Sequence, residues 1–568
     1  MRRFLPSVFR KEPGPAKEIV VDGARKAGSG RPRNRLLMTI VAFFAIYAVL
    51  AGRLVHLGFL DPEASGVPAG RVTATRPDIV DRAGVVLATD IKTASLFAEP
   101  RRIVDADEAI EKLSTVLPDL EIEQTWHKLR SGAGFVWLRR QLSPKQQADI
   151  MALGIPGVGF RTEKRRFYPS GATASHILGL TNIDNQGISG IEKYIDDQGL
   201  ADLQATGLAT DLKPVRLSID LRVQHIVHDE LTLAMDKYHA IAAGAVILDV
   251  KTGEVAAMVS LPDYDPNNPF NAHEKDRLNR MSAGVFEMGS TIKSFTTAMA
   301  LDSGKVTLES RFDATRPITI GKQTIRDFHG KGRVLTVPEV FIYSSNIGSA
   351  READVVGIEG HREFLKRIGL LDRMDTELPE VARPTEPKVW KKVHSITIAF
   401  GHGMSTTPLQ TAVAAAALMN GGKLMDPTFL PRTLDRANAI ATRVIAEKTS
   451  EDMRYLYRLN AEKGSGKRAE VPGYRVGGKT GTAEKVVNGR YSKDKRFNAF
   501  LAAFPMDDPQ WIVLAIIDEP KPEKPGMGAT SGLNAAPTVA AIIRRAAPLL
   551  GVKPEFGHES GSLLVSYQ

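Results

Sequence analysis

Hydrophobic and polar positions divide the chain into one long apolar run, a mixed region and a large region rich in regular structure. The run extends from Leu36 to Gly52 without a charged residue. Arg53 interrupts it, and apolar residues continue beyond, so residues 36–57 reach the roughly 20 positions that a membrane-spanning helix needs. An Arg near a helix end can extend its charged group to the interface. The pattern therefore predicts one transmembrane helix over 36–57.

Residues 58–224 show mixed patterning that is typical of a small domain with short strands and helices. The pattern predicts a strand, a turn at Ala83 and Gly84, and a second strand over 79–87. It also predicts helices over 106–118 and 143–153, the second of which begins at Ser143. We expect a separate, smaller domain here.

Residues 225–550 alternate between strand and helix patterns, which predicts a single large domain of the α+β class. Two β-branched runs, 244–250 and 254–259, flank Gly253 and predict a hairpin that belongs to a large sheet. The expected helices are three Ala-rich stretches, 290–302, 408–419 and 535–547. Residues 551–568 form a polar tail without a readable role.

Charge is concentrated at the start of the chain. The formal net charge is +10, and residues 1–35 alone carry ten Lys or Arg against three acids. A basic tail before an apolar run places residues 1–35 in the cytoplasm and the rest outside. A cleaved signal peptide and a buried core helix are the alternatives for the run. Because the basic excess is a tail and not a folded face, we expect no nucleic-acid partner.

Cysteine is absent, which excludes thiolate catalysis, disulfides and Cys-ligated metals. The histidines show no metal-ligand spacing, so no metal site is predicted. His402, between two glycines, is interpreted as part of a loop and not as a catalytic base.

Three short motifs occur in an order that is typical of serine acyl-transferases. They are S-x-x-K at Ser290 to Lys293, S-x-N at Ser344 to Asn346, and K-T-G-T at Lys479 to Thr482. Each is weak alone, since a second S-x-x-K begins at Ser492 in a charged segment interpreted as a loop. A second K-T-G lies in the hairpin turn that ends at Gly253. The ordered triple separates the candidate site from these repeats.

The residue types suit nucleophilic catalysis. Ser290 at a helix start has Lys293 one turn along on the same face. A serine hydroxyl needs a base, and Lys serves only when neutral, a form favoured by burial and by a second cation such as Lys479. Taken singly, a helix-start Ser is usually a cap and an isolated Lys a solvated charge.

The other motif residues suit substrate handling. Ser344 can relay a proton between Lys293 and a leaving amine, and the amide of Asn346 can hold a peptide backbone. The small-residue strand around Gly481 predicts a sheet edge that an extended peptide can join. Lys479 and the hydroxyls of Thr480 and Thr482 can bind a carboxylate, and the N–H groups of Ser290 and Thr482 are candidates for an oxyanion hole.

Further motifs carry a family resemblance over nearly the whole chain. The triple, together with six local motifs, resembles the class B penicillin-binding proteins, most closely the division-specific peptidoglycan D,D-transpeptidases of the FtsI type. The motifs are Arg76–Gly84, Arg166–Gly171, Gly187–Glu192, Ser218–Gln224, Tyr264–Asn267 and Thr407–Gln410. Pro77 replaces a family glycine, and Met288 replaces a family proline before the nucleophile; neither carries a reacting group.

The resemblance implies a penicillin-binding transpeptidase fold, an antiparallel sheet flanked by helices, on a pedestal of the dimerisation type. It implies that Ser290 attacks the D-Ala-D-Ala end of peptidoglycan stem peptides and that β-lactams acylate the same serine. No cofactor or metal is implied. The expected partners are a septal glycosyltransferase and other divisome proteins, at the bacterial inner membrane with the catalytic domain in the periplasm.

Several alternatives share the chemistry. An elongation-specific class B transpeptidase differs in its partners and its position in the cell, and a DD-carboxypeptidase uses water as acceptor. A β-lactamase would need a deacylating Glu that the segment between Asn346 and Lys479 does not offer as E-x-x-L-N. A non-catalytic scaffold conflicts with the intact triple, and a β-lactam sensor with the short segment 1–35.

Overall fold

The structure, a computed structural model, describes residues 37–38, 40–51, 76–199, 212–321, 323–487 and 489–556. The chain divides into two units, residues 1–71 and 72–568. In the first, residues 40–51 are helical with exposed side chains. Over the described ranges, no helix has the length and apolar character required to cross a membrane. The predicted tail 1–35 and part of the predicted span 36–57 lie outside those ranges.

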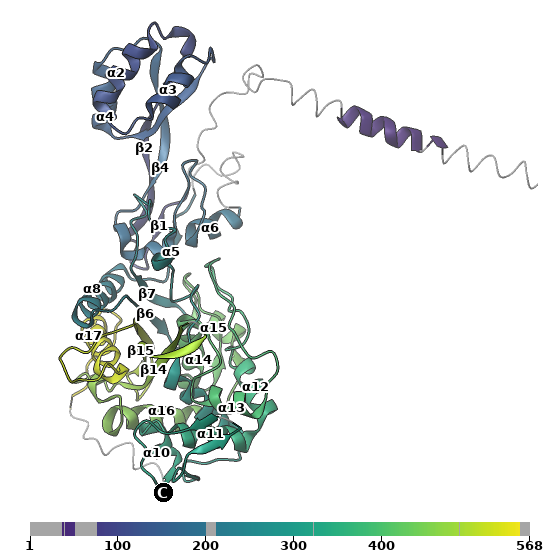
Figure 1. The fold of residues 1–568 in the computed structure, drawn as a ribbon, viewed down its shortest axis with the longest axis vertical. Coiled ribbons are helices and arrows are strands. Elements are labelled where there is room, and N and C mark those ends of the chain that lie inside the picture. Colours follow the sequence, from purple (N-terminus) through teal and green to yellow (C-terminus); the bar gives the residue numbers. More distant parts are fainter. Residues whose placement is uncertain are drawn as a thin grey trace, which may run out of the picture. The chain divides into compact units, whose positions relative to one another are not determined.

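A five-stranded sheet forms the frame of the pedestal (Figure 1). The long strands β2 and β4 pair antiparallel, and the predicted turn before β2 is confirmed, with Gly84 at φ 90°. The order is β3-β2-β1-β5, and β4 pairs with β2. The strands are β1 (Ile79–Val80), β2 (Val86–Ala98), β3 (Val136–Leu142), β4 (Val158–Phe167) and β5 (Val215–Arg216).

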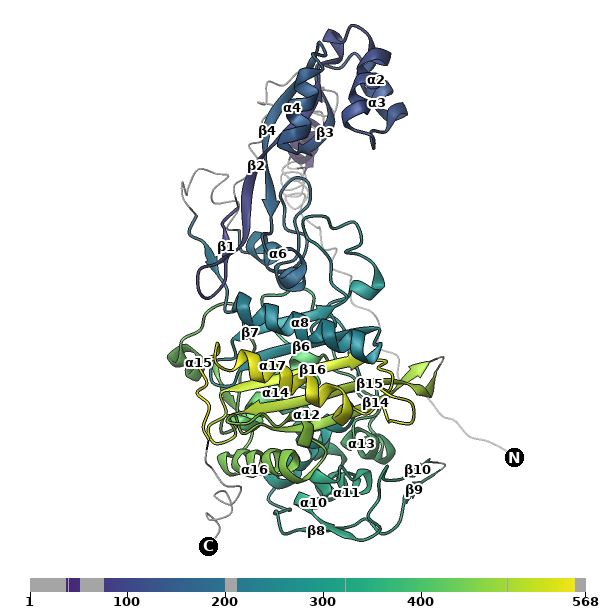
Figure 2. The ribbon, with the colours of Figure 1, turned by 90° about the vertical axis from the view of Figure 1, so that its left-hand side faces the viewer.

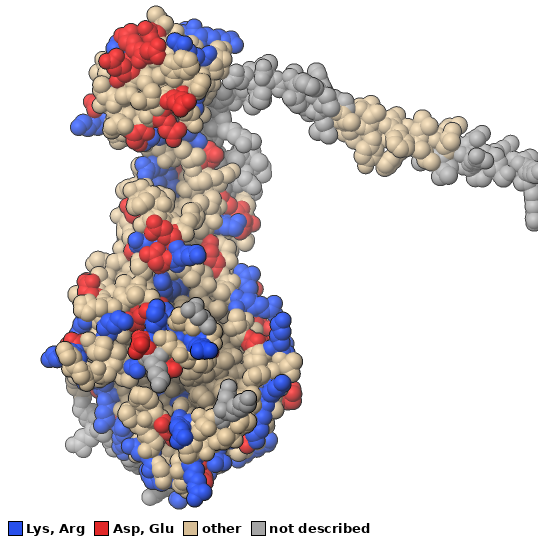
Figure 3. Space-filling view, in the orientation of Figure 1, with Lys and Arg blue, Asp and Glu red and all other residues tan. Residues whose placement is uncertain are grey.

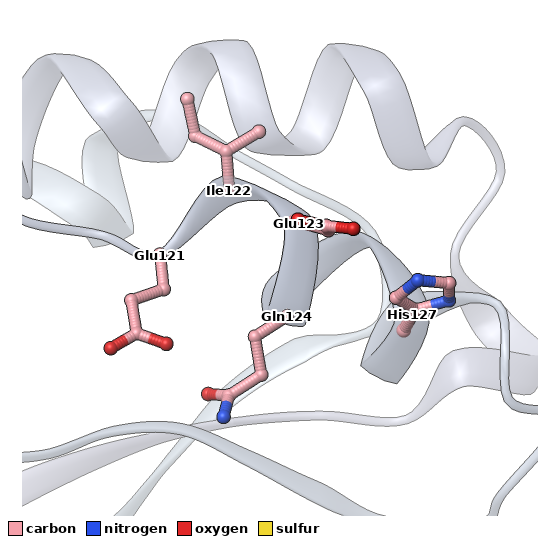
Figure 4. A pocket seen from close by; sticks show the side chains of 5 residues that line it. All are labelled: Glu121, Ile122, Glu123, Gln124 and His127. Carbon is pink, nitrogen blue, oxygen red and sulfur yellow. The ribbon is translucent and has the colours of Figure 1, made fainter.

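Three short helices pack at one end of β2 and β4: α2 (Ala106–Val116), α3 (Ile122–Leu129) and α4 (Pro144–Ala152). The two helices predicted from the sequence are α2 and α4. Ser143 caps α4 in a capping box with Gln146, as its helix-start signal indicated. A pocket on α3 has exposed lining side chains (Figure 4), and no candidate residue of the triple lies there. Its lining is Glu121, Ile122, Glu123, Gln124 and His127.

Buried ion pairs connect three of the pedestal motifs. The carboxylate of Glu192, fully buried in α6 (Gly190–Asp197), accepts from Arg76 Nε at 2.8 Å and from Arg166 Nε at 2.6 Å. Asp90 adds a second carboxylate 3.2 Å from Arg166 Nη1. Both guanidinium groups are nearly buried, so each needs these partners. This network explains why Arg and Glu stand in three separate motifs.

The pedestal also contacts the larger domain, and one contact joins a motif of the pedestal to a motif of the larger domain. The side chain of Asn267 accepts from the backbone N–H of Tyr168 and donates to its carbonyl, each at 2.9 Å. Glu380 accepts from the N–H of Gly190 at the start of α6, at 3.2 Å. The motif residues around Tyr168 and Asn267 therefore meet across this contact.

The larger domain is built on a five-stranded antiparallel sheet in the order β14-β15-β16-β6-β7. The predicted hairpin is confirmed as β6 and β7, with Gly253 at φ 72° in the turn. β14 lies at the edge, as predicted. The strands are β6 (Ala242–Asp249), β7 (Val255–Leu261), β14 (Gly477–Val487), β15 (Arg490–Phe504) and β16 (Trp511–Asp518).

Helices cover both faces of this sheet (Figure 2). Along β6, Ala245 and Ile247 belong to one core and Val246 and Leu248 to the other, which is the alternation of a strand buried on both faces. The helices α8 (Leu221–Tyr238) and α17 (Ala535–Ala546) cover the first face. The second core contains α9 (Lys293–Asp302), α14 (Pro408–Met419) and α16 (Glu447–Lys463). The expected α+β class, a sheet flanked by helices, is confirmed.

The remaining described elements are short or lie farther from the large sheet. The helices are α5 (Ser175–Leu178), α10 (Val337–Ile342), α11 (Asn346–Val356), α12 (Ile358–Arg367), α13 (Lys392–Ala399) and α15 (Leu434–Ile440). The strands are β8 (Arg311–Asp313), β9 (Ile318–Ile320), β10 (Gln323–Ile325), β11 (Val334–Thr336), β12 (Lys423–Leu424) and β13 (Thr442–Arg443). The 3₁₀ turns are η1 (Pro100–Arg102), η2 (Gly171–Ala174), η3 (Lys275–Arg277), η4 (Gly289–Ile292), η5 (Lys467–Ala469) and η6 (Ser531–Leu533).

Two segments differ from what the sequence predicted, one interpreted as a loop and the other as a polar tail. The second S-x-x-K, from Ser492, lies within strand β15 and not in a loop. On either side of it Tyr491 pairs with Val486 and Arg496 with Glu484 of β14, with a register shift between the two pairs. At the other end of the domain, Val552 is buried in the core around α17, and the N–H of Glu555 donates to Gly473 at 2.8 Å. The described start of the predicted tail 551–568 thus packs on the domain.

Candidate active site

The candidate nucleophile lies where a turn becomes a helix. Ser290 is half-buried in the 3₁₀ turn η4, and α9 continues from Lys293. Gly289 adopts φ 54°, a left-handed conformation that glycine allows at low cost. The sequence thus predicted the position of Ser290 correctly, at the start of a helix.

Three glycines let backbone segments meet around η4. A Cβ on Gly481 of β14 would lie 2.5 Å from the Met288 carbonyl oxygen, and one on Gly289 would lie 2.8 Å from the Thr482 oxygen. A Cβ on Gly401 would lie 1.9 Å from the Gly289 oxygen. Side chains cannot occupy such distances, so the edge strand and the loop around Gly401 approach the turn of Ser290 through backbone atoms alone.

The structure brings four candidate residues into one hydrogen-bonded group. Lys293 Nζ donates to Ser344 Oγ at 3.0 Å, to Ser344 O at 2.6 Å and to Asn346 Oδ1 at 2.8 Å. Lys479 Nζ donates to the same Ser344 Oγ at 2.9 Å. Two lysines that lie 51 and 135 positions from Ser344 in the chain therefore converge on its hydroxyl.

Burial controls the charge of both lysines, which are 1% and 0% exposed. It lowers the pKa of Lys293 to about 7, although the charges of Asp327 and Glu352 raise it. Burial also lowers the pKa of Lys479 well below its usual value, and the Lys293 charge adds to that effect. We predicted that burial and the charge of Lys479 would both favour neutral Lys293; burial is the main cause, and the effect of the like charge appears on Lys479. Because both lysines are buried and donate to the same hydroxyl, the protonated form of one disfavours protonation of the other.

The side-chain amide of Asn346 is hydrogen-bonded to the protein at both ends. Its Oδ1 accepts from Lys293, and its Nδ2 donates to the Arg326 carbonyl at 2.9 Å. Both ends of the amide thus have protein partners in the structure, whereas the motif suggested an amide free for substrate.

The K-T-G-T residues line the open edge of the sheet. Thr480 Oγ1 and Ser465 Oγ form a hydrogen bond of 2.6 Å. Thr482 Oγ1 accepts from the Ser531 N–H at 3.1 Å. Gly481, between them, packs on η4 as described above. The edge therefore presents hydroxyls and a buried lysine beside the candidate nucleophile, Ser290.

Sequence reasoning missed several polar residues next to the triple. Asp327 accepts from the Ser345 hydroxyl at 2.8 Å, and the fully buried Glu352 accepts from the Thr297 hydroxyl at 3.0 Å. Burial raises the pKa of Glu352 to about 8. Ser465 and Ser531 support the edge strand. Among these only the Ser531 position had a signal, a Gly/Ser turn before a helix; the others depend on tertiary contact.

A pocket of about 580 Å³ opens beside Asn346. Burial lowers the pKa of His402 in its wall to about 4, so this ring is neutral. Tyr491 completes the wall and donates its hydroxyl to Glu287 at 3.1 Å. The remaining lining is Thr324, Ile325, Arg326, Val393, His394, Thr397, Phe400 and Gly403. The site thus continues into a mixed apolar and polar wall.

The fold and this site define a serine transpeptidase domain on a pedestal, and comparison with known proteins agrees. The penicillin binding protein transpeptidase domain matches residues 243–544, and the penicillin-binding protein dimerisation domain matches residues 71–200. The chain belongs to the class B penicillin-binding proteins. The predicted enzyme class, a serine-type D-Ala-D-Ala transpeptidase, is confirmed.

Three relatives illustrate the range of similarity. A probable peptidoglycan D,D-transpeptidase FtsI of Caulobacter vibrioides is 39% identical over 93% of this chain and 90% of its own length. The peptidoglycan D,D-transpeptidase FtsI of Escherichia coli is 29% identical over 89% of this chain and 90% of its own length. Stage V sporulation protein D of Bacillus subtilis is 31% identical over 92% of this chain and 86% of its own length.

Proposed function

We propose that this chain cross-links peptidoglycan stem peptides through an acyl-enzyme on Ser290. The observation that carries the proposal is the convergence of Lys293 and Lys479 on the hydroxyl of Ser344. A buried lysine that loses its proton near neutral pH can act as the base that a serine nucleophile requires.

In the proposed acylation, Ser290 Oγ attacks the carbonyl of the penultimate D-Ala while Lys293 Nζ takes the hydroxyl proton. The N–H groups of Ser290 and Thr482 hold the developing oxyanion. The proton passes by way of Ser344 Oγ to the leaving nitrogen, and D-Ala departs. The hydrogen bonds from both lysines to Ser344 support a relay at this hydroxyl.

The acyl-enzyme then reacts with an amine of a neighbouring stem peptide. That amine attacks the ester carbonyl, its proton returns along the same relay, and Ser290 Oγ regains its hydrogen. Lys479, Thr480 and Thr482 would bind the terminal carboxylate of the donor, which lies along the edge of β14. Gly481 allows that strand to approach Ser290. Asn346 would hold the donor backbone once substrate displaces one of its present partners.

β-Lactams are proposed to acylate Ser290 as mimics of the D-Ala-D-Ala end. The test is the intact mass of the full-length chain in detergent after incubation with a penicillin, beside Ser290→Ala. We expect a stable adduct on the parent protein only. An adduct on Ser290→Ala would exclude Ser290 as the nucleophile. Hydrolysed drug without an adduct would indicate a β-lactamase.

We further propose that the enzyme acts at the division septum, anchored in the inner membrane by residues 36–57, with the catalytic domain outside. The FtsI names of two relatives favour division over elongation. The basic residues before the apolar run support the orientation, and the described helix 40–51 is apolar and exposed. A septal glycosyltransferase and other divisome proteins are the proposed partners. Depletion should give filamentous cells; loss of rod shape without filaments would favour the elongation alternative.

The charges visible on the larger domain do not favour nucleic acid. Figure 3 shows basic and acidic side chains intermingled on this face, without a continuous basic stripe.

A further inference from the structure

Asp327 lies outside the three motifs, in the exposed segment between β10 and β11. Its two carboxylate oxygens reach separate parts of the S-x-N turn. Oδ2 accepts from the Ser345 hydroxyl at 2.8 Å, and Oδ1 accepts from the Ile347 N–H at 2.9 Å. The adjacent Arg326 carbonyl accepts from Asn346 Nδ2. Residues 326 and 327 therefore hold three successive residues after Ser344.

The turn that they hold has an unfavourable backbone. Ser344 adopts φ 54°, a left-handed conformation that costs free energy for any residue with a Cβ. Such a conformation persists only where neighbouring contacts over-determine it. The hydroxyl of Ser345 donates to Asp327 and accepts from the Gly348 N–H at 2.9 Å, so it fixes the turn to the start of α11.

The position of this turn decides what Lys293 contacts. All three hydrogen bonds of the Lys293 ammonium end on the turn, at Ser344 O, Ser344 Oγ and Asn346 Oδ1. If the turn relaxed to a right-handed conformation, the hydroxyl shared by Lys293 and Lys479 would move. The contacts of Asp327 therefore reach the reacting groups through the backbone of residues 344–347.

Asp327 also contributes charge. Its carboxylate favours the protonated form of Lys293, as does Glu352, against the effect of burial. The charged or titratable groups around Lys293 are Asp327 before β11, Glu352 on α11, Lys479 on β14 and His402 in the loop around Gly401. Asp327 is thus one of two carboxyl groups whose negative charge, when present, favours the protonated form of this lysine.

We propose that Asp327 is a positioning residue of the transpeptidase, which holds the Ser344–Asn346 turn so that one hydroxyl serves both lysines. The inference rests on the proposed acylation of Ser290. Asp327 touches no reacting atom; it acts through Ser345 and Ile347.

The test compares Asp327→Ala, Asp327→Asn and Asp327→Glu with the parent chain. His329→Ala is the matched control, since His329 lies two residues away, is exposed, and contacts only the ring of Phe328 among the interactions described. The measured quantity is the second-order rate constant for acylation by a fluorescent penicillin between pH 5 and 9, with thermal unfolding in parallel.

We expect Asp327→Ala to lower the rate constant about 10²-fold, the size of effect that a small displacement of catalytic groups produces. Asp327→Asn keeps one acceptor and the side-chain shape, so it should lose less. Both variants remove a negative charge, which lowers the Lys293 pKa, so the rising limb of the pH profile should move to lower pH. Asp327→Glu should restore the parental limb.

A purely structural role would lower the unfolding temperature and leave the pH limb of the remaining activity unchanged. If Asp327→Asn and Asp327→Ala both fold and keep the parental acylation rate constant and the parental pH profile, the proposal is overturned. If Asp327→Ala does not fold, an unshifted limb in Asp327→Asn overturns it alone. Acylation of Ser290→Ala would instead refute the proposed function, so the two failures are distinguishable.

Discussion

At the scale of single residues, the site depends on burying charged groups in a small volume. Lys293 and Lys479 are buried, and Glu352 lies buried one helix away with its pKa raised to about 8. Burial of a charge is costly unless the group is neutral or paired. The fold therefore stabilises a neutral lysine beside a serine hydroxyl, which is the state that a base requires.

The pH dependence of acylation follows from Lys293. Its folded-state pKa is lowered to about 7, so the neutral form grows as pH rises through that value. The acylation rate constant should accordingly rise about tenfold per pH unit below pH 7 and level above it. Stopped-flow acylation with a penicillin over pH 5–9 measures this limb.

Lys293→Arg provides the control, because an arginine keeps its proton throughout this range. It should acylate negligibly at every pH. A flat profile for the parent protein, or a rising limb retained in Lys293→Arg, would contradict the assignment of Lys293 as the base.

Residue patterns predicted part of this site. Ser290, Lys293, Ser344, Asn346 and Lys479 were found because their motifs have fixed short spacings. Asp327 lies 18 positions before Ser345, a separation that follows no local rule, so its contact arises only from the fold. Glu352 reads in sequence as an ordinary surface charge of a helix, yet it is fully buried.

At the scale of elements, the contact between β14 and η4 sets the geometry around Ser290. Both segments are close because Gly481 and Gly289 lack side chains. The pattern of small residues indicated an edge strand, but it could not show which backbone the strand would meet. Likewise the charged run at Ser492 suggested a loop. It lies in the outer part of the hairpin formed by β14 and β15, where a strand does not need alternating apolar residues because neither face is covered.

Gly481→Ala tests this contact. The new Cβ would meet the Met288 oxygen at 2.5 Å, so β14 must move away from the turn of Ser290. We expect acylation to fall about 10²-fold, measured with a fluorescent penicillin. Gly134→Ala, where no heavy atom lies within 4 Å of the new Cβ, is the matched control. Parental acylation in Gly481→Ala would show that the close approach is unnecessary.

At the scale of the whole molecule, the pedestal motifs prove to be parts of one buried charge network. Sequence reasoning recognised Arg76, Arg166 and Glu192 as separate motif residues but could not relate them, because 116 positions separate the first from the last. The fold class and the hairpin of β6 and β7 were predictable from alternation. The domain limits at 58–224 and 225–550 stay predictions.

Glu192→Gln should destabilise the pedestal strongly. It removes the carboxylate shared by two buried guanidinium groups, and breaking a buried ion pair costs about 3–5 kcal/mol. Calorimetry should show a lower unfolding temperature than for Asp119→Asn, which removes an exposed pair with Arg139. Equal unfolding temperatures for the two variants would mean that the network contributes little.

The packing of Gly289, Gly401 and Gly481 also has a consequence for drug resistance. Because touching backbone meets at these three glycines, a side chain at any of them should displace the turn of Ser290 and harm turnover of the natural peptide. Mutations that reduce β-lactam binding while preserving growth are therefore expected away from the three glycines, where side chains such as Phe328 and Tyr491 are exposed. Selection under antibiotic pressure would enrich changes at that rim and spare the centre.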